Sequence, residues 1–330
     1  MKDFVLVSLR DDNLVCRFSS DNGVLKDRVD FNLCYGPGPM TINSYGNTLF
    51  VGLRKSNQLV AINIDEEANL TEISRTIIPS DPCFLCLDFS GKYLFSSYYN
   101  AGRIALHKWD LREKSLKELT RICTFNKAHS LVLDPTEHYI YVLHTEPNII
   151  VQFRFDKLNG MLSQSAIKSY IPEAYLCPRH AIFHPTKQLL YTVNEKSNSV
   201  SVFSINISSG SLKLVETLST LPNNTSILNM AAEIKLGKDA QYLYISNRGH
   251  NSIAYFHIDL KTGIPRLIDT VPAPKTPRSF DISKDGTMLY CAGQDDGILV
   301  TYKINQDGFP KETNREYIGR YPMWVTALSI

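Results

Sequence analysis

Apolar and polar residues alternate along the chain in many short runs. Residues 199–205 read Ser-Val-Ser-Val-Phe-Ser-Ile, and residues 253–258 form a comparable run. Alternation with a period of two over four to eight residues predicts a β-strand with one buried face. Polar turns, often containing Asn, separate the runs. The pattern therefore predicts an all-β protein built from many short strands.

A longer frame recurs along the chain. It consists of a short alternating strand, a polar turn and a second strand that opens with a Leu-aromatic pair, as in residues 82–95, 178–191 and 277–290. Further copies span 37–50, 128–141 and 231–244, and the first half recurs from residue 322. A third strand, and then a turn followed by Leu or Pro, complete each copy. Successive copies start 45 to 53 residues apart, a period typical of four-stranded propeller blades.

The two ends of the chain contribute to the same repeat. The C-terminus supplies only a first strand, whereas residues 4–8 and 14–18 have the pattern of second and third strands. Pairing the last strand with the first ones would remove two open sheet edges and close the ring. Residues 110–121 contain good helix formers, but their register with the other copies predicts a turn and an outer strand. We expect one domain, residues 1–330, folded as a seven-bladed antiparallel β-propeller.

Composition limits the classes of partner. Lys and Arg number 35 against 33 Asp and Glu, and they are scattered, so a nucleic-acid partner is not expected. The first apolar run is too short for a signal peptide, and nowhere do about 18 apolar residues run together, so a membrane is not expected either. Seven cysteines, an odd number, indicate a reducing compartment. The predicted location is cytoplasmic, without an obligatory protein partner.

Cys83 and Cys86 form the one closely spaced pair of thiols. On a strand, residues three apart point to opposite faces, so the two thiols would not chelate one metal ion. The pair therefore does not predict a metal site.

Polar residues cluster at one end of the predicted channel. In a four-stranded blade, the start of the inner strand and the turn between the second and third strands lie on the same face. Charged and imidazole groups from several blades would meet there and form a concave site. The principal candidates are His129, Arg179, Glu195 and Arg248. The candidates for substrate contacts are His180, Tyr98, Asn100, Asn194, Glu233, Arg278, Gln294 and Trp324.

Four segments carry a resemblance to a known family. Residues 96–102, 177–185 together with 193–200, 231–234 and 319–325 resemble the 6-phosphogluconolactonase family of seven-bladed propellers, the cycloisomerase-2 type. The likeness covers nearly the full chain. It implies hydrolysis of 6-phospho-D-glucono-1,5-lactone to 6-phospho-D-gluconate in the pentose phosphate pathway, with no metal and no other cofactor.

The resemblance also implies roles for single residues. The family's His, two Arg and Glu correspond to His129, Arg179, Arg248 and Glu195. The sequence departs from the family at 229–230, where a Trp is usual, and at Glu233, where the family has Asp. These changes affect the expected sugar contacts more than the fold.

Opening a lactone requires a water molecule, a base and a positive group near the carbonyl oxygen as it becomes an oxyanion. Either Glu195 or His129 would serve as the base. Arg179 and Arg248 would stabilise the oxyanion or bind the phosphate.

Three alternatives stay open at this point. Relatives with this fold interconvert a carboxymuconate and its lactone. A metal-dependent sugar lactonase would need oxygen ligands, which Glu195, Glu233, Asn194 and Asn100 could supply. A non-catalytic propeller would bind a protein or peptide at its rim. A serine-nucleophile elbow, an H-E-x-x-H motif and a phosphate-binding loop do not occur in the sequence.

Overall fold

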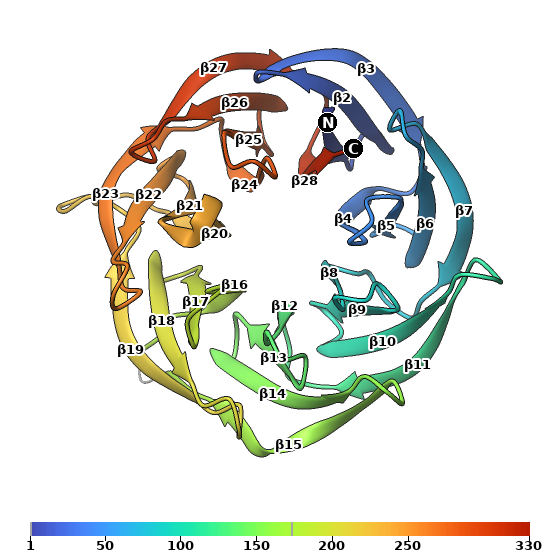
Figure 1. Cartoon of the computed structure of the whole chain (residues 1–330), viewed down its shortest axis with the longest axis horizontal. Coiled ribbons are helices and arrows are strands. Elements are labelled where there is room, and N and C mark those ends of the chain that lie inside the picture. Colours follow the sequence, from blue (N-terminus) through green and yellow to red (C-terminus); the bar gives the residue numbers. More distant parts are fainter. Residues whose placement is uncertain (1, 173) are drawn as a thin grey trace.

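Seven four-stranded antiparallel sheets surround a central axis in the computed structural model (Figure 1), which describes residues 2–172 and 174–330. In each sheet, the first strand of the sequence frame lies next to the axis. The fold therefore confirms the predicted seven-bladed β-propeller and its four strands per blade.

Six sheets are formed by consecutive strands. From the inner to the outer strand, the first three are β4 (Pro37–Ile42), β5 (Thr48–Leu53), β6 (Gln58–Ile64) and β7 (Leu70–Ile77); β8 (Phe84–Leu87), β9 (Tyr93–Tyr98), β10 (Arg103–Asp110) and β11 (Ser115–Cys123); and β12 (Ala128–Leu133), β13 (Tyr139–His144), β14 (Ile149–Asp156) and β15 (Met161–Tyr170). The next three are β16 (Pro178–Phe183), β17 (Leu189–Asn194), β18 (Ser199–Ile205) and β19 (Leu212–Ser219); β20 (Met230–Leu236), β21 (Tyr242–Arg248), β22 (Ser252–Ile258) and β23 (Pro265–Pro272); and β24 (Pro277–Ile282), β25 (Met288–Gly293), β26 (Ile298–Ile304) and β27 (Pro310–Tyr317).

The seventh sheet joins the two ends of the chain. Its strands, again from the inside out, are β28 (Pro322–Ser329), β1 (Asp3–Leu9), β2 (Leu14–Asp21) and β3 (Val24–Asn32). β28 pairs with β1 so that Val325 lies opposite Val7. Backbone hydrogen bonds between Lys2 and Ile330 extend this ladder to the end of the chain. The predicted split blade is confirmed, and Figure 1 places the two termini side by side.

The described residues contain almost no helix. Residues 110–121 form a turn and most of β11, as the register predicted. The one helical element in the described part of the chain is the short 3₁₀ turn Lys238–Ala240. No helix among these residues is long or apolar enough to cross a membrane.

The core lies between sheets. Seven clusters of buried apolar residues each combine side chains from two neighbouring sheets. For example, Phe95 of β9 and Val142 of β13 belong to one cluster. Since each sheet packs on two neighbours, most apolar residues of the middle strands are buried on both faces of the sheet.

A hydrogen bond between neighbouring sheets explains two features of the repeat. The aromatic residue of the Leu-aromatic pair is often Tyr, and its hydroxyl donates to the carbonyl of a turn glycine in the next sheet. The Tyr141 hydroxyl reaches the Gly210 oxygen at 2.6 Å, and the Tyr191 hydroxyl reaches the Gly263 oxygen at 2.7 Å. Gly210 has a φ of +69°, and a Cβ there would collide with the Tyr139 ring. Only glycine adopts this positive φ without strain and also leaves room for the Tyr139 ring.

Replacing Tyr141 with Phe should lower the free energy of unfolding by about 1 kcal/mol, because a buried carbonyl loses its donor. The shift in the urea unfolding midpoint measures this loss. Tyr45→Phe is the matched control, since the Tyr45 side chain is 81% exposed. Equal midpoints for the two variants would contradict the stabilising role of the Tyr141 bond.

Candidate active site

A small pocket opens at the face of the ring where the inner strands begin. Its volume is about 200 Å³, and it is lined by Arg54, Cys83, Tyr99, His129, Glu195 and Arg278. These residues belong to the sheets of β4–β7, β8–β11, β12–β15, β16–β19 and β24–β27. The structure therefore brings together groups that lie far apart in the sequence.

His129, the second residue of β12, contributes an imidazole to the pocket. The residue is 5% exposed, and its ring contacts the rings of Tyr99 and His180. Its Nδ1 has no hydrogen-bond partner among the described residues. Burial, and next the positive charge of Arg179, hold the pKa of His129 well below its usual value. The imidazole is therefore neutral at neutral pH and able to accept a proton.

Glu195 follows β17 directly and faces the same pocket. One of its oxygens accepts a hydrogen bond of 2.5 Å from Arg248 Nη2. Arg248 is itself held by a 3.2 Å bond from Nε to the Met230 carbonyl. Burial alone would raise the pKa of Glu195, but the guanidiniums of Arg179 and Arg248 outweigh it and lower the pKa. The carboxylate is therefore ionised at neutral pH.

The guanidinium of Arg179 is positioned by His180, which is itself hydrogen-bonded to Glu233. Glu233 is buried and accepts a hydrogen bond from His180 Nδ1 at 2.9 Å. Because an ionised carboxylate can only accept, Nδ1 carries the proton and Nε2 is left as an acceptor. Arg179 Nη1 lies 3.3 Å from that Nε2 and also donates to the Ala232 carbonyl. The Glu233–His180 pair thus fixes the position of the Arg179 guanidinium.

The electrostatics of this triplet agree with that hydrogen-bond pattern. Burial lowers the pKa of His180 to about 4, so its ring is neutral. Burial would raise the pKa of Glu233, but the contact with His180 outweighs it and the pKa falls to about 2. Burial also lowers the pKa of Arg179 to about 9, which leaves the guanidinium charged at neutral pH.

Aromatic rings close the channel beside the pocket. The Phe84 ring lies 5.2 Å from that of His180 and 5.6 Å from that of Trp324, and these edge contacts join three sheets across the axis. The predicted candidates His180 and Trp324 therefore pack against Phe84 and are not among the residues that line the pocket.

Arg278 is the predicted substrate contact that lines this pocket, and Tyr98, Asn100 and Asn194 are among those that lie away from it. Tyr98 is fully buried between sheets, where its hydroxyl accepts a bond from Ser96. Asn194 donates to Ser199 and Ser201 within its own sheet. Asn100 is exposed on a turn and does not line the pocket.

Strand parity explains these differences. Tyr98 and Asn194 are the last residues of β9 and β17, and they face the space between sheets. The next residues, Tyr99 and Glu195, turn to the channel, as Arg54 does after β5. The position of Tyr99 and Arg54 directly after a second strand predicts that both lie at this rim, although the sequence alone assigns neither a role.

The alternative metal site is not assembled. Glu195 is paired with Arg248, Glu233 with His180, and Asn194 with the hydroxyls of its own sheet. Within residues 2–172 and 174–330, no group of three or more His, Cys, Asp or Glu is arranged to hold a metal ion. Glu195, Glu233 and Asn194 therefore do not fit a common ion.

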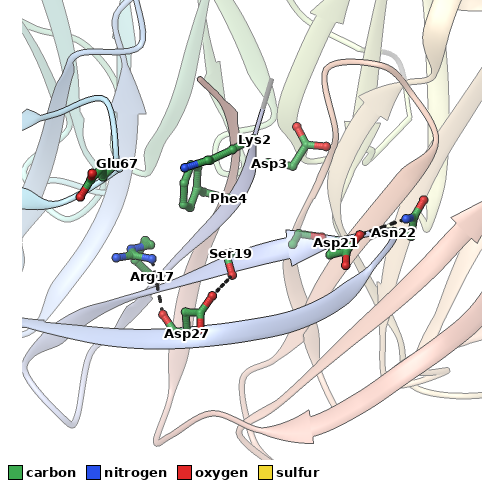
Figure 2. Close-up of a pocket in the computed structure, with 10 residues that line it drawn as sticks. Lys2, Asp3, Phe4, Arg17, Ser19, Asp21, Asn22, Asp27 and Glu67 are labelled. Atoms are coloured by element: carbon green, nitrogen blue, oxygen red, sulfur yellow. Dashed lines mark hydrogen bonds between the residues drawn. The ribbon is translucent and has the colours of Figure 1, made fainter.

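A larger cavity, of about 600 Å³, lies at the opposite face, where β1 begins and β2 ends (Figure 2). Leu6 stands here at the position that Tyr141 occupies in its sheet, and Ala68 replaces the turn glycine. This seam therefore lacks the bond between a tyrosine and a turn carbonyl, as do the seams where Phe50 and Phe95 stand at that position. The acidic groups are engaged locally, since Ser19 bonds Asp27 and Lys26 pairs with Asp21. The cavity brings together no base and oxyanion-stabilising pair.

Replacing Glu233 with Ala should lower the free energy of unfolding by about 1–3 kcal/mol, because His180 Nδ1 then lacks its buried acceptor. The urea unfolding midpoint measures the change. Glu312→Ala is the control, since Glu312 forms an exposed pair with Arg315 and should shift the midpoint little. An unchanged midpoint for Glu233→Ala would show that the pair is not stabilising.

Comparisons with known proteins agree with this architecture. The 6-phosphogluconolactonase of Pectobacterium atrosepticum is 29% identical over 293 residues, 88% of this chain and 88% of that protein. The enzyme of the same name from Yersinia enterocolitica is 28% identical over 292 residues, 88% of this chain and 87% of that protein.

Two solved structures share the fold over nearly all of both chains. The periplasmic gluconolactonase of Pseudomonas aeruginosa superposes with a TM-score of 0.89 at 20% identity, covering 100% of this chain and 99% of that one. A protein from Lactobacillus plantarum gives a TM-score of 0.89 at 18% identity and covers 100% of both chains. The family described as Lactonase, 7-bladed beta-propeller, matches residues 4–327. The chain therefore belongs to the seven-bladed β-propeller lactonase family.

Proposed function

We propose that this lactonase hydrolyses 6-phospho-D-glucono-1,5-lactone to 6-phospho-D-gluconate in the channel pocket. The observation that carries the proposal is the pairing of a neutral imidazole with an ionised carboxylate, both facing one pocket among several guanidiniums. The names of the curated bacterial relatives point to the same substrate.

His129 is the better placed of the two candidate bases. Glu195 is tied to Arg248 by a 2.5 Å hydrogen bond, whereas His129 Nδ1 has no partner among the described residues. In the proposed reaction, water adds to the lactone carbonyl carbon as His129 accepts its proton. The tetrahedral intermediate then breaks the bond between that carbon and the ring oxygen. His129 returns its proton to the leaving oxygen, giving a hydroxyl group and a carboxylic acid, and the acid loses its remaining proton to water to become a carboxylate.

Arg179 and Arg248 supply positive potential where the carbonyl oxygen becomes an oxyanion. Both guanidiniums are buried, so their field is less screened than it would be in water. Glu195 keeps Arg248 in place and limits the excess of positive charge beside His129. The proposed location is the cytoplasm, in the pentose phosphate pathway, and the free state of all seven cysteines is in keeping with a reducing compartment.

The activity can be measured in a coupled assay in which glucose-6-phosphate dehydrogenase generates the lactone. The protein should clear the lactone faster than its spontaneous hydrolysis, and EDTA should not change the rate. Clearance at the spontaneous rate would refute the proposed function. Loss of activity with EDTA would instead require a metal ion.

Arg179→Ala should reduce kcat by about two to three orders of magnitude, because charge stabilisation of the oxyanion is lost. Circular dichroism verifies that the variant is folded. Arg154→Ala is the control, since Arg154 is exposed on β14 and should keep full turnover. Wild-type turnover by Arg179→Ala would remove this residue from the mechanism.

The acid limb of kcat/KM against pH should lie well below the ordinary histidine value of about 6.5. The pKa of His129 is lowered, so its base form persists as the pH falls through 6.5 and is lost only at lower pH. Glu195 likewise keeps its charge, because its pKa is also lowered. A half-maximal point at or above pH 6.5 would exclude His129 in this environment as the base.

A further inference from the structure

The positive charges around the pocket are unequally matched by carboxylates. Arg54 pairs with Asp81 at 2.7 Å, and Arg248 pairs with Glu195 at 2.5 Å. Among the described residues, neither Arg179 nor Arg278 forms an ion pair with a carboxylate. The pocket therefore holds more positive than negative charge, and buried charges of one sign favour a ligand of the other.

Arg278 differs from Arg179 in having most of its donors unused. Arg179 Nη1 donates to the Ala232 carbonyl, and Arg179 is not among the residues that line the pocket. Arg278 is half-buried, lines the pocket and makes one long contact of 3.4 Å with Gln294 Oε1. A guanidinium presents five N–H groups in a planar fork that matches two oxygens of a phosphate.

The charges that flank Arg278 support this reading of the pocket. Burial, and next repulsion by Arg248 and Arg54, lower the pKa of Arg278 to about 10. The group is still charged at neutral pH, and a bound dianion would relieve the repulsion among the three guanidiniums.

The candidate base and the unpaired arginine lie on different sides of the ring. Arg278 is the second residue of β24, and Arg54 follows β5, so their sheets flank the one that contains the chain ends. His129 and Glu195 come from the sheets that begin with β12 and β16, on the other side of the axis (Figure 1). A ligand that spans the pocket would thus meet a base at one end and, at the other, the guanidinium of Arg278, which has no carboxylate partner among the described residues.

We propose that Arg278, assisted by Arg54, binds the phosphate group of the substrate and makes the enzyme prefer phosphorylated lactones. This inference rests on the proposed lactonase function and adds a residue that determines substrate specificity. It assigns the phosphate to Arg278 and Arg54 and leaves Arg179 and Arg248 to the carbonyl end. Since the phosphate does not react, Arg278 acts through binding.

The test compares kcat/KM for 6-phospho-D-glucono-1,5-lactone and for unphosphorylated D-glucono-1,5-lactone. In Arg278→Gln the preference for the phosphorylated lactone should fall about 10- to 100-fold, mainly through KM, because a charge-assisted contact is lost. Arg278→Lys keeps the charge without the fork, so its preference should lie between those of Arg278→Gln and the wild type.

Arg315→Gln is the matched control. Arg315 lies on the outer strand of the same sheet, in an exposed pair with Glu312, and its loss should leave the preference unchanged. An equal loss of kcat/KM for both lactones in Arg278→Gln would overturn the proposal, because Arg278 would then act on the lactone ring. An unchanged preference would overturn it as well.

A binding measurement separates this inference from the proposed function. If the wild type accelerates the hydrolysis of neither lactone, the proposed function is wrong. Calorimetry with 6-phospho-D-gluconate and D-gluconate then still tests whether Arg278 binds the phosphate group. Tighter binding of the phosphorylated acid that is lost in Arg278→Gln would support the phosphate site. Equal binding of both acids, or no binding of either, would overturn it.

Discussion

The ladder between β28 and β1 is the constraint on which the rest of the structure depends. Each of the other six sheets is a local meander whose strands follow one another in sequence. Buried apolar residues hold each of these sheets to its neighbours, and the pairing of β28 with β1 closes the row of sheets into a ring. The pocket takes residues from five sheets on all sides of the axis, so its geometry exists only in a closed ring.

Burial then gives the pocket its chemistry. At the mouth of an open groove, the charges of Arg179, Arg248 and Arg278 would be screened by water. Burial, together with the charges of the arginines, keeps His129 neutral, whereas the same charges overcome the effect of burial on Glu195 and keep its carboxylate ionised. The Glu233–His180 pair contributes indirectly, since it fixes a tautomer and, through it, the place of one guanidinium.

Most of the fold can be predicted from short-range patterns in the sequence. Strand alternation, turn residues and a constant period are properties of neighbouring residues, so the blades and the split sheet could be read without coordinates. The site was less accessible, because a shift of one residue decides whether a side chain faces the channel. The side chains of Tyr98 and Asn194 face the space between sheets, whereas the side chain of Tyr99 faces the channel. Which carboxylate pairs with which arginine depends on distances between sheets, and no local pattern encodes those distances.

The split sheet also sets the order in which the molecule can mature. β28 consists of residues 322–329, so the ribosome synthesises it after every other strand of the ring. Until β28 appears, the growing chain has six sheets and an unfinished seventh, with bare backbone donors along β1. The enzyme is therefore built as an open arc, and a working site is assembled only after β28 has been made.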